Sequence, residues 1–84
     1  NELTNLRLTD IVNNANTKIK RLIGVSDDFN FEEVGNEEEL DLFLNYCWYD
    51  WNDSSNEFTT NYLNDINSIR HKFEVEQYDS EEEE

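Results

Sequence analysis

The chain has 84 residues, a formal net charge of −15, 13% aromatic residues, two glycines and no proline. This length allows one domain with one core, and the single cysteine, Cys47, excludes an internal disulfide and favours a reducing, cytoplasmic setting. The negative charge opposes direct binding to nucleic acid or to an anionic membrane surface, so basic partners are expected. No apolar run reaches the roughly 18–20 residues that a bilayer crossing requires.

The first predicted element is a helix over about residues 9–23. Apolar residues recur at three- and four-residue intervals from Leu8 to Ile23, as on one face of a helix. Thr9 is placed as its N-cap, and Gly24 is placed to end it.

A second helix is predicted over about residues 36–51, where Asn36 and Glu39 form a capping-box pattern. One apolar stripe follows, made of Leu40, Phe43, Leu44, Cys47, Trp48 and Trp51. The opposite side carries a narrower apolar line, made of Leu42, Tyr46 and Tyr49. Either this helix is buried on two sides, or the narrower line is an exposed aromatic strip rimmed by carboxylates, as in a protein interface.

A third helix is predicted over about residues 54–73. Ser54 and Glu57 form a second capping-box pattern at its start. Apolar residues then follow one helix face from Phe58 to Phe73. Together the three segments predict an all-α fold, a small three-helix bundle.

Short alternating patterns leave one other fold open. Residues 28–34 and 73–78 alternate as short strands do, which makes a small α+β fold the alternative to the bundle. The acidic residues 79–84 are expected to be disordered, because a run of like charges repels itself. The sequence therefore predicts one domain over residues 1–78 and a disordered acidic tail.

Groups that could carry catalysis are scarce. His71, the only histidine, lies between Arg70 and Lys72 near a predicted helix end. Cys47 lies on an apolar stripe, where a thiol is usually inert. Neither glycine belongs to a phosphate-binding loop motif. We therefore expect no enzyme activity and no cofactor.

One set of oxygen ligands matches a calcium loop in part. Asp28, Asn30, Glu32 and Glu39 have the 1-3-5-12 spacing of an EF-hand, but Glu33 occupies the sixth position, which requires glycine. We expect no metal site, with calcium binding at these four residues as the alternative.

Acidic residues are concentrated in the second part of the chain. Residues 1–35 carry six acidic and four basic side chains, whereas residues 36–84 carry fifteen acidic and two basic ones. The 48 residues between Arg21 and Arg70 contain twelve carboxylates and no lysine or arginine. Carboxylates on successive helix turns lie about 5–6 Å apart, so such a block offers a basic cleft a row of charges comparable to phosphates.

We expect a partner-binding face on the second and third predicted helices. Its carboxylates would steer a basic partner, and its tyrosines would supply short-range contact. The residues are Glu37, Glu38, Glu39, Asp41, Tyr46, Tyr49, Asp50, Asp53, Glu57 and Asp65.

The block 22–69 without bases, the aromatic and acidic stretch from Leu40 to Trp51 and the Glu81–Glu84 tail resemble, in composition, a known class of protein. These are the small acidic DNA-mimic inhibitors, of anti-CRISPR and anti-restriction type, which phages and mobile elements use against host nucleases. The resemblance implies a phage-encoded stoichiometric inhibitor that acts in the host cytoplasm on the basic cleft of a CRISPR effector or restriction enzyme. Two alternatives fit the same residues: an immunity protein that neutralises a basic nuclease toxin, and an acidic chaperone or adaptor for basic DNA-binding proteins. Both a monomer and a homodimer fit the sequence.

Overall fold

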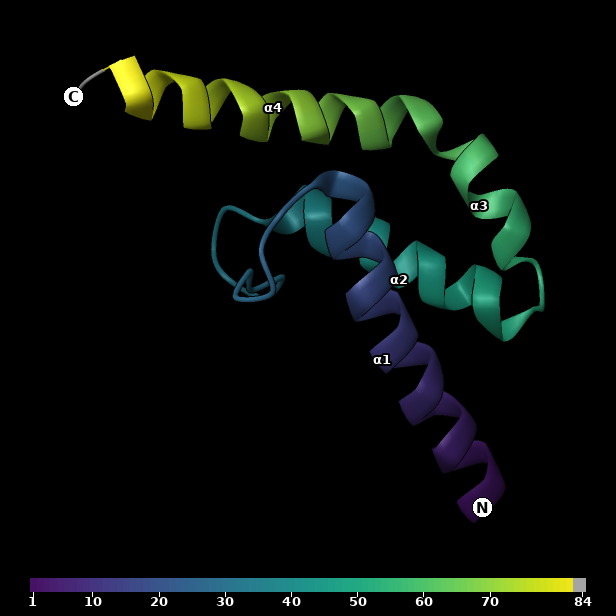
Figure 1. Cartoon of the computed structure of the whole chain (residues 1–84). Helices are drawn as coiled ribbons and strands as arrows, with labels where there is room; N and C mark the ends of the chain where they lie inside the picture. The colour runs from purple at the N-terminus through teal and green to yellow at the C-terminus, as the bar shows by residue number, and fades with distance from the viewer. Residues whose placement is uncertain (83–84) are drawn as a thin grey trace.

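The fold comes from a computed structural model that describes the backbone of residues 1–82 and the side chains of residues 1–76. The described part is helical and contains no strand, which confirms the all-α prediction and excludes the α+β alternative. The four helices are α1 (Glu2–Ile23), α2 (Glu37–Trp51), α3 (Ser55–Asn61) and α4 (Leu63–Glu82). In Figure 1, α4 passes across the C-terminal end of α1, and α3 connects α2 to α4. None of the helices in this part of the chain combines the length and the apolar character needed to cross a bilayer.

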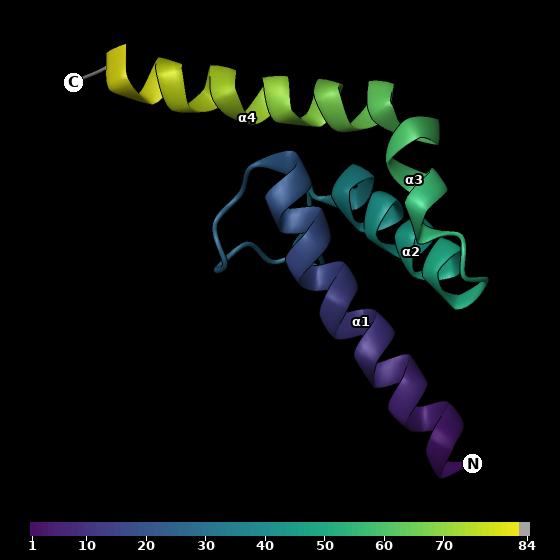
Figure 2. The same cartoon turned by 45° about the vertical axis from the view of Figure 1, so that its right-hand side comes forward.

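Helix α1 begins at Glu2, earlier than predicted. Asn1 is its N-cap, because the Asn1 Oδ1 accepts a hydrogen bond from the backbone N–H of Thr4 at 2.8 Å. Thr9 is therefore not the cap, and its hydroxyl donates to the Asn5 carbonyl at 2.9 Å. The first turn of α1 extends away from the other helices (Figures 1 and 2). Apolar periodicity missed the start of the helix because local capping, rather than burial, begins it.

Gly24 ends α1, as predicted. Its backbone is left-handed, with φ of 76°, and its N–H donates to the Lys20 carbonyl at 3.0 Å. A residue with a Cβ adopts this conformation only at a cost, so glycine suits this helix terminus.

The third predicted helix is two helices. The chain breaks at Tyr62, between α3 and α4, and α4 then continues to Glu82. Residues 73–78 are thus helical rather than a strand, because no glycine or proline interrupts the segment. Helix α4 covers residues 79–82 of the tail that was predicted to be disordered, and residues 83–84 lie outside the described part of the chain.

The two predicted capping boxes do not form. The Asn36 side chain donates to the Asn30 carbonyl at 2.8 Å instead of capping α2. The Ser54 hydroxyl points to the Asn52 carbonyl, at 3.3 Å, instead of capping α3. The predicted reciprocal partner of Asn36 is Glu39, which is turned into the protein interior.

The core is aromatic and draws on all four helices and the α1–α2 loop. Phe58 of α3 is fully buried; its ring stacks on Tyr62 at 4.7 Å and meets Tyr46 edge-on at 5.1 Å. Phe31 of the loop is also buried, with its ring 4.9 Å from that of Phe43. The buried cluster is Ala15, Ile19, Ile23, Phe31, Leu42, Tyr46, Phe58, Ile66 and Ile69.

Helix α2 is buried on two sides, which is one of the two predicted arrangements. Leu42 and Tyr46 of the narrower line are buried, and Phe43 of the wider stripe packs partly against the core. Leu44 and Trp48 belong to the wider stripe but are exposed, so the prediction that the whole stripe faces the core is wrong for these two residues.

Candidate functional site

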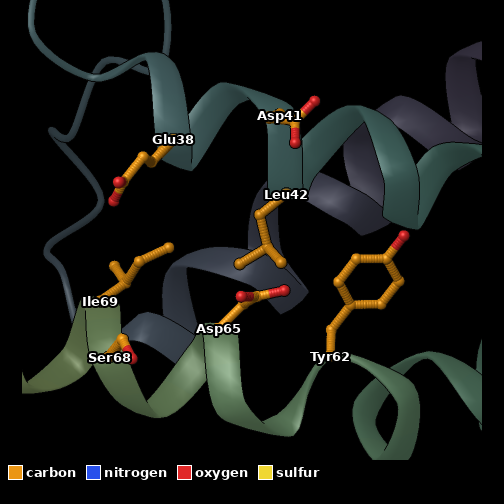
Figure 3. A pocket seen from close by; sticks show the side chains of 7 residues that line it. All are labelled: Glu38, Asp41, Leu42, Tyr62, Asp65, Ser68 and Ile69. Carbon is orange, nitrogen blue, oxygen red and sulfur yellow. The ribbon is translucent and has the colours of Figure 1, made fainter.

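A groove of about 360 Å³ lies between α2 and α4. Its polar rim carries three exposed carboxylates, with Glu38 and Asp41 on α2 and Asp65 on α4 (Figure 3). Leu42 and Ile69, both buried, lie at its base. The groove thus brings together three of the ten residues that the sequence predicted for partner binding.

The neighbouring buried residues place these carboxylates on the rim. Leu42 directly follows Asp41 and packs in the core, which orients this turn of α2. Ile66 directly follows Asp65 and does the same for α4. Because core packing defines the rotation of both helices, the charged side chains on their outer faces are held in a defined arrangement.

Tyr62 closes one end of the groove. Figure 3 shows its ring standing up towards α2, with the hydroxyl group beside the helix. Desolvation raises the pKa of this phenol, and Tyr49 and the carboxylates of Asp41 and Asp65 raise it further. The phenol therefore stays protonated at neutral pH and can donate a hydrogen bond at the end of the groove.

The groove carboxylates form no ion pair within the described residues, although the charges of Lys72 and Glu38 attract each other. Within residues 1–76 the ion pairs are Arg7 with Asp53, at 3.5 Å, and Lys72 with Glu39. Neither involves a groove carboxylate. The groove consequently has negative potential along both of its walls.

Glu39 is not a partner-binding residue. Its side chain is fully buried, its Oε1 accepts a hydrogen bond from the Lys72 ammonium group, and its Oε2 has no hydrogen-bond partner among the side chains of residues 1–76 or the described backbone. This hydrogen bond, more than the attraction between the charges, raises the pKa of Lys72, against the opposing effect of desolvation. The pair joins α2 to α4 below the groove.

The burial of Glu39 also removes the twelfth ligand of the alternative calcium loop. Asn30 accepts a hydrogen bond from the Glu32 N–H at 2.9 Å, which is a local turn contact. The described residues contain no group of three or more histidine, cysteine or acidic side chains that could hold a metal ion.

The two tyrosines predicted to contact a partner both pack against the aromatic core. Tyr46 is buried, and this burial, with a smaller effect of Asp50, raises the pKa of its phenol. The Tyr49 ring packs edge-on against Phe58 at 5.6 Å, and its hydroxyl accepts a hydrogen bond from Asn61 at 3.2 Å. Burial leaves little of the Tyr46 ring for contact with a partner, whereas Tyr49 is half-buried and also lines the shallow surface pocket beside Trp48.

The remaining predicted acids are dispersed. Asp53, whose φ is 57°, pairs with Arg7. Arg7 also donates to the Trp51 carbonyl at 2.5 Å and lies 4.5 Å from the centre of the Trp51 ring. Asp50 follows Asp41 by nine residues, which places it on the opposite side of α2 from the groove.

Glu37, at the start of α2, and Glu57, in α3, are exposed and lie outside the groove. Hydrogen bonds from its own backbone N–H and from that of Gly35 lower the pKa of Glu37, so its carboxylate is firmly charged. Glu57 lines a shallow pocket of about 230 Å³ with Trp48, at the junction of α2 and α3. Both residues extend the negative surface beyond the groove.

A second groove, of about 350 Å³, was not anticipated from the sequence. It lies between α1 and α2 and is lined by Leu8, Ile11, Val12, Leu44, Cys47, Trp48 and Trp51. The two apolar lines on residues 36–51 could have indicated this groove. A helix with apolar residues around most of its circumference cannot bury all of them in so small a protein.

No family model, curated protein or solved structure matches this chain. The functional argument therefore rests on the surface chemistry of the protein.

Proposed function

We propose that the protein is a stoichiometric inhibitor that imitates DNA. It occupies the basic nucleic-acid-binding cleft of a host defence nuclease, such as a CRISPR effector or a restriction enzyme, in the host cytoplasm. The observation that supports this proposal is the groove between α2 and α4, where Glu38, Asp41 and Asp65 are exposed and form no ion pair within the described residues.

The groove carboxylates are suited to replace phosphates. Glu38 and Asp41 are three residues apart on one helix, a spacing of about 5–6 Å between their Cβ atoms. Asp65 adds charge from the opposite wall. A lysine or arginine at about 4 Å from such a carboxylate gains about 1 kcal/mol in water and about 4 kcal/mol near a protein surface. Desolvation and side-chain entropy reduce the net contribution of each exposed ion pair to about 0–1 kcal/mol, so several such contacts act together.

The surrounding field adds speed to this binding. The protein carries a net charge of −15, and the 48 residues between Arg21 and Arg70 contain no base. A field of this sign attracts a basic cleft over several ångströms and raises the association rate, and added salt weakens it. Inhibition of this kind needs no catalytic group.

The proposal is tested by capture and mutation. The protein is immobilised, a bacterial host lysate is passed over it at low salt, and the retained proteins are eluted at high salt. We expect a basic nuclease, whose affinity is then measured by calorimetry. Replacing Glu38, Asp41 and Asp65 by their amides should weaken this affinity by at least about tenfold, or about 1.4 kcal/mol.

A charge-matched control separates the groove from net charge. Asp10, Asp27 and Asp28 are exposed and lie outside the candidate surface. Replacing them by asparagine removes the same number of charges and should change the affinity by less than about threefold at physiological salt, where screening extends over about 8 Å. Equal losses in the two triple variants, or the absence of any retained nucleic-acid-binding protein, would contradict the proposal.

A further inference from the structure

The groove between α1 and α2 gathers exposed apolar side chains that the fold leaves uncovered. Leu44 and Trp48 of α2 are 55% and 65% exposed, and Leu8 and Val12 of α1 are 45% and 47% exposed. Every side chain that lines the groove is apolar or a cysteine. Figure 2 shows α1 and α2 crossing at an angle, and side chains of both helices line the groove. Exposed apolar side chains gathered in one groove are typical of a binding surface.

Carboxylates flank the most exposed of these side chains. Glu37, Asp41, Leu44 and Trp48 are spaced by three or four residues and are all exposed, so they form one ridge of α2. On the other side of Trp48, Glu57 of α3 shares a shallow pocket with it. The tryptophan therefore lies between acidic groups, at the border of the apolar groove.

No basic side chain lines the apolar groove. Arg7, on the same part of α1, is engaged by Asp53 and by the Trp51 ring and carbonyl. Charge complementarity thus requires a partner that brings its own lysines or arginines next to its apolar side chains.

We propose that this groove binds a basic amphipathic helix of the partner protein, with apolar side chains placed against Trp48 and Leu44 and basic side chains near Asp41 and Glu57. The inference rests on the proposed function for the identity of that partner as a basic protein. It adds a second, apolar point of attachment, which supplies the short-range contact that phosphate-like charges lack. Asp41 connects the two surfaces, since it lines the acidic groove and also belongs to the ridge that carries Trp48.

A second copy of the chain is a poorer occupant. A two-fold pairing of α2 against α2 would place the Asp41 carboxylates and the Glu57 carboxylates of the two copies near one another. Pairing α2 against α1 gains no ion pair, because the exposed polar neighbours on α1, such as Asn5 and Thr9, are uncharged. Repulsion between acidic chains therefore opposes dimerisation through this groove.

The test uses two synthetic peptides and the intact protein. The first is an amphipathic helical peptide of leucine and lysine, about four turns long. The second keeps every lysine and replaces each leucine by serine, so the two peptides have the same charge. Calorimetry at physiological salt should show at least about tenfold tighter binding of the leucine peptide, the size expected for an interface with a central tryptophan.

Variants then locate the binding. Trp48→Ala, and independently Leu44→Ser, should remove the preference for the leucine peptide and leave the affinity for the serine peptide within about twofold. Both side chains are exposed, and circular dichroism verifies that the variants fold. Leu3→Ala, at an exposed leucine outside the groove, is the matched control and should retain the preference.

Three outcomes would overturn the inference: equal affinity for the two peptides, a preference that survives both groove substitutions, or a concentration-dependent dimer in sedimentation equilibrium that Trp48→Ala dissociates. The last result would assign the groove to a second copy. No nuclease takes part in these measurements, so failure here is distinguishable from failure of the proposed inhibitor function.

Discussion

Replacing Lys72 with methionine isolates the buried ion pair that joins α2 and α4. The substitution keeps an unbranched side chain of similar length but removes the hydrogen bond that the fully buried Glu39 carboxylate accepts from Lys72. Breaking a buried pair on one side costs about 3–5 kcal/mol. Because the Lys72 side chain is 38% exposed and partly solvated, we expect the lower end, about 3 kcal/mol.

This loss is large for a protein of this size. At about 0.05–0.15 kcal/mol per residue the whole chain has roughly 4–13 kcal/mol of stability. With a urea dependence of about 1 kcal/mol per molar, the unfolding midpoint should fall by about 3 M, as followed by far-ultraviolet circular dichroism. Lys18→Met, at an exposed lysine of α1, is the control and should change the stability by less than about 0.5 kcal/mol.

The double variant Glu39→Met/Lys72→Met completes the test. It removes both charges together, and replacing a buried pair by apolar residues is often neutral or stabilising by about 1–4 kcal/mol. We therefore expect the double variant to recover most of the stability that Lys72→Met alone loses. A Lys72→Met midpoint within about 0.5 M of the parent, which is about 0.5 kcal/mol, would refute the reasoning. A double variant as unstable as the single one would do the same.

Two further predictions concern the core and the pH dependence. Phe58→Ala removes the ring at the centre of the aromatic cluster and should lower the free energy of unfolding in urea by about 3–5 kcal/mol. The control Leu6→Ala, at an exposed position, should lower it by less than about 0.5 kcal/mol. Similar losses of stability in both variants would contradict the described core. Stability should also fall in alkaline solution. In the folded state the pKa values of Lys72 and Tyr46 are raised above their ordinary values of 10.5 and 10.0. Both groups therefore hold their protons more tightly in the folded protein than in the unfolded chain. The stability that these two protonated groups contribute is fully present below about pH 10 and is lost as the pH rises through their folded-state pKa values. The urea midpoint should therefore be lower at about pH 11 than at about pH 8. An equal or higher midpoint at the alkaline pH would contradict this expected direction.

Sequence periodicity predicted the helical fold where helices are buried and failed where they are not. Residues 36–51 and the C-terminal half of α1 carry apolar faces that pack in the core, and both were predicted. The segment before Thr9 and the segment after Phe73 are helical because of capping and the absence of helix breakers, which an apolar period does not report.

The acidic surface was predictable as a region but not residue by residue. Glu38 and Glu39 are chemically alike and adjacent, yet one lines the groove and the other is buried. The difference depends on how α2 is rotated in the fold and on Lys72, which lies 33 residues further along the chain. Such long-range pairing is absent from local sequence patterns.

Which aromatic side chain of α2 is exposed, Tyr46 or Trp48, also depends on a contact from a distant part of the chain. The sequence left open whether the narrower line of α2, which contains Tyr46, is buried together with the wider stripe or exposed to a partner. Phe58 of α3 packs edge-on against Tyr46, so the narrower line is buried, and Trp48 is left on the outside. The position of a third helix, rather than the pattern within α2, decides which aromatic residue a partner can reach.

Mutual exclusion between this protein and DNA on the captured nuclease tests the inhibitor function most directly. A fluorescently labelled DNA duplex is bound to the nuclease, the protein is added in increasing amounts, and the anisotropy of the duplex is followed. The shared basic cleft predicts that the duplex is released completely as the protein approaches one copy per cleft. A ternary complex, in which the duplex stays bound at saturating protein, would contradict it.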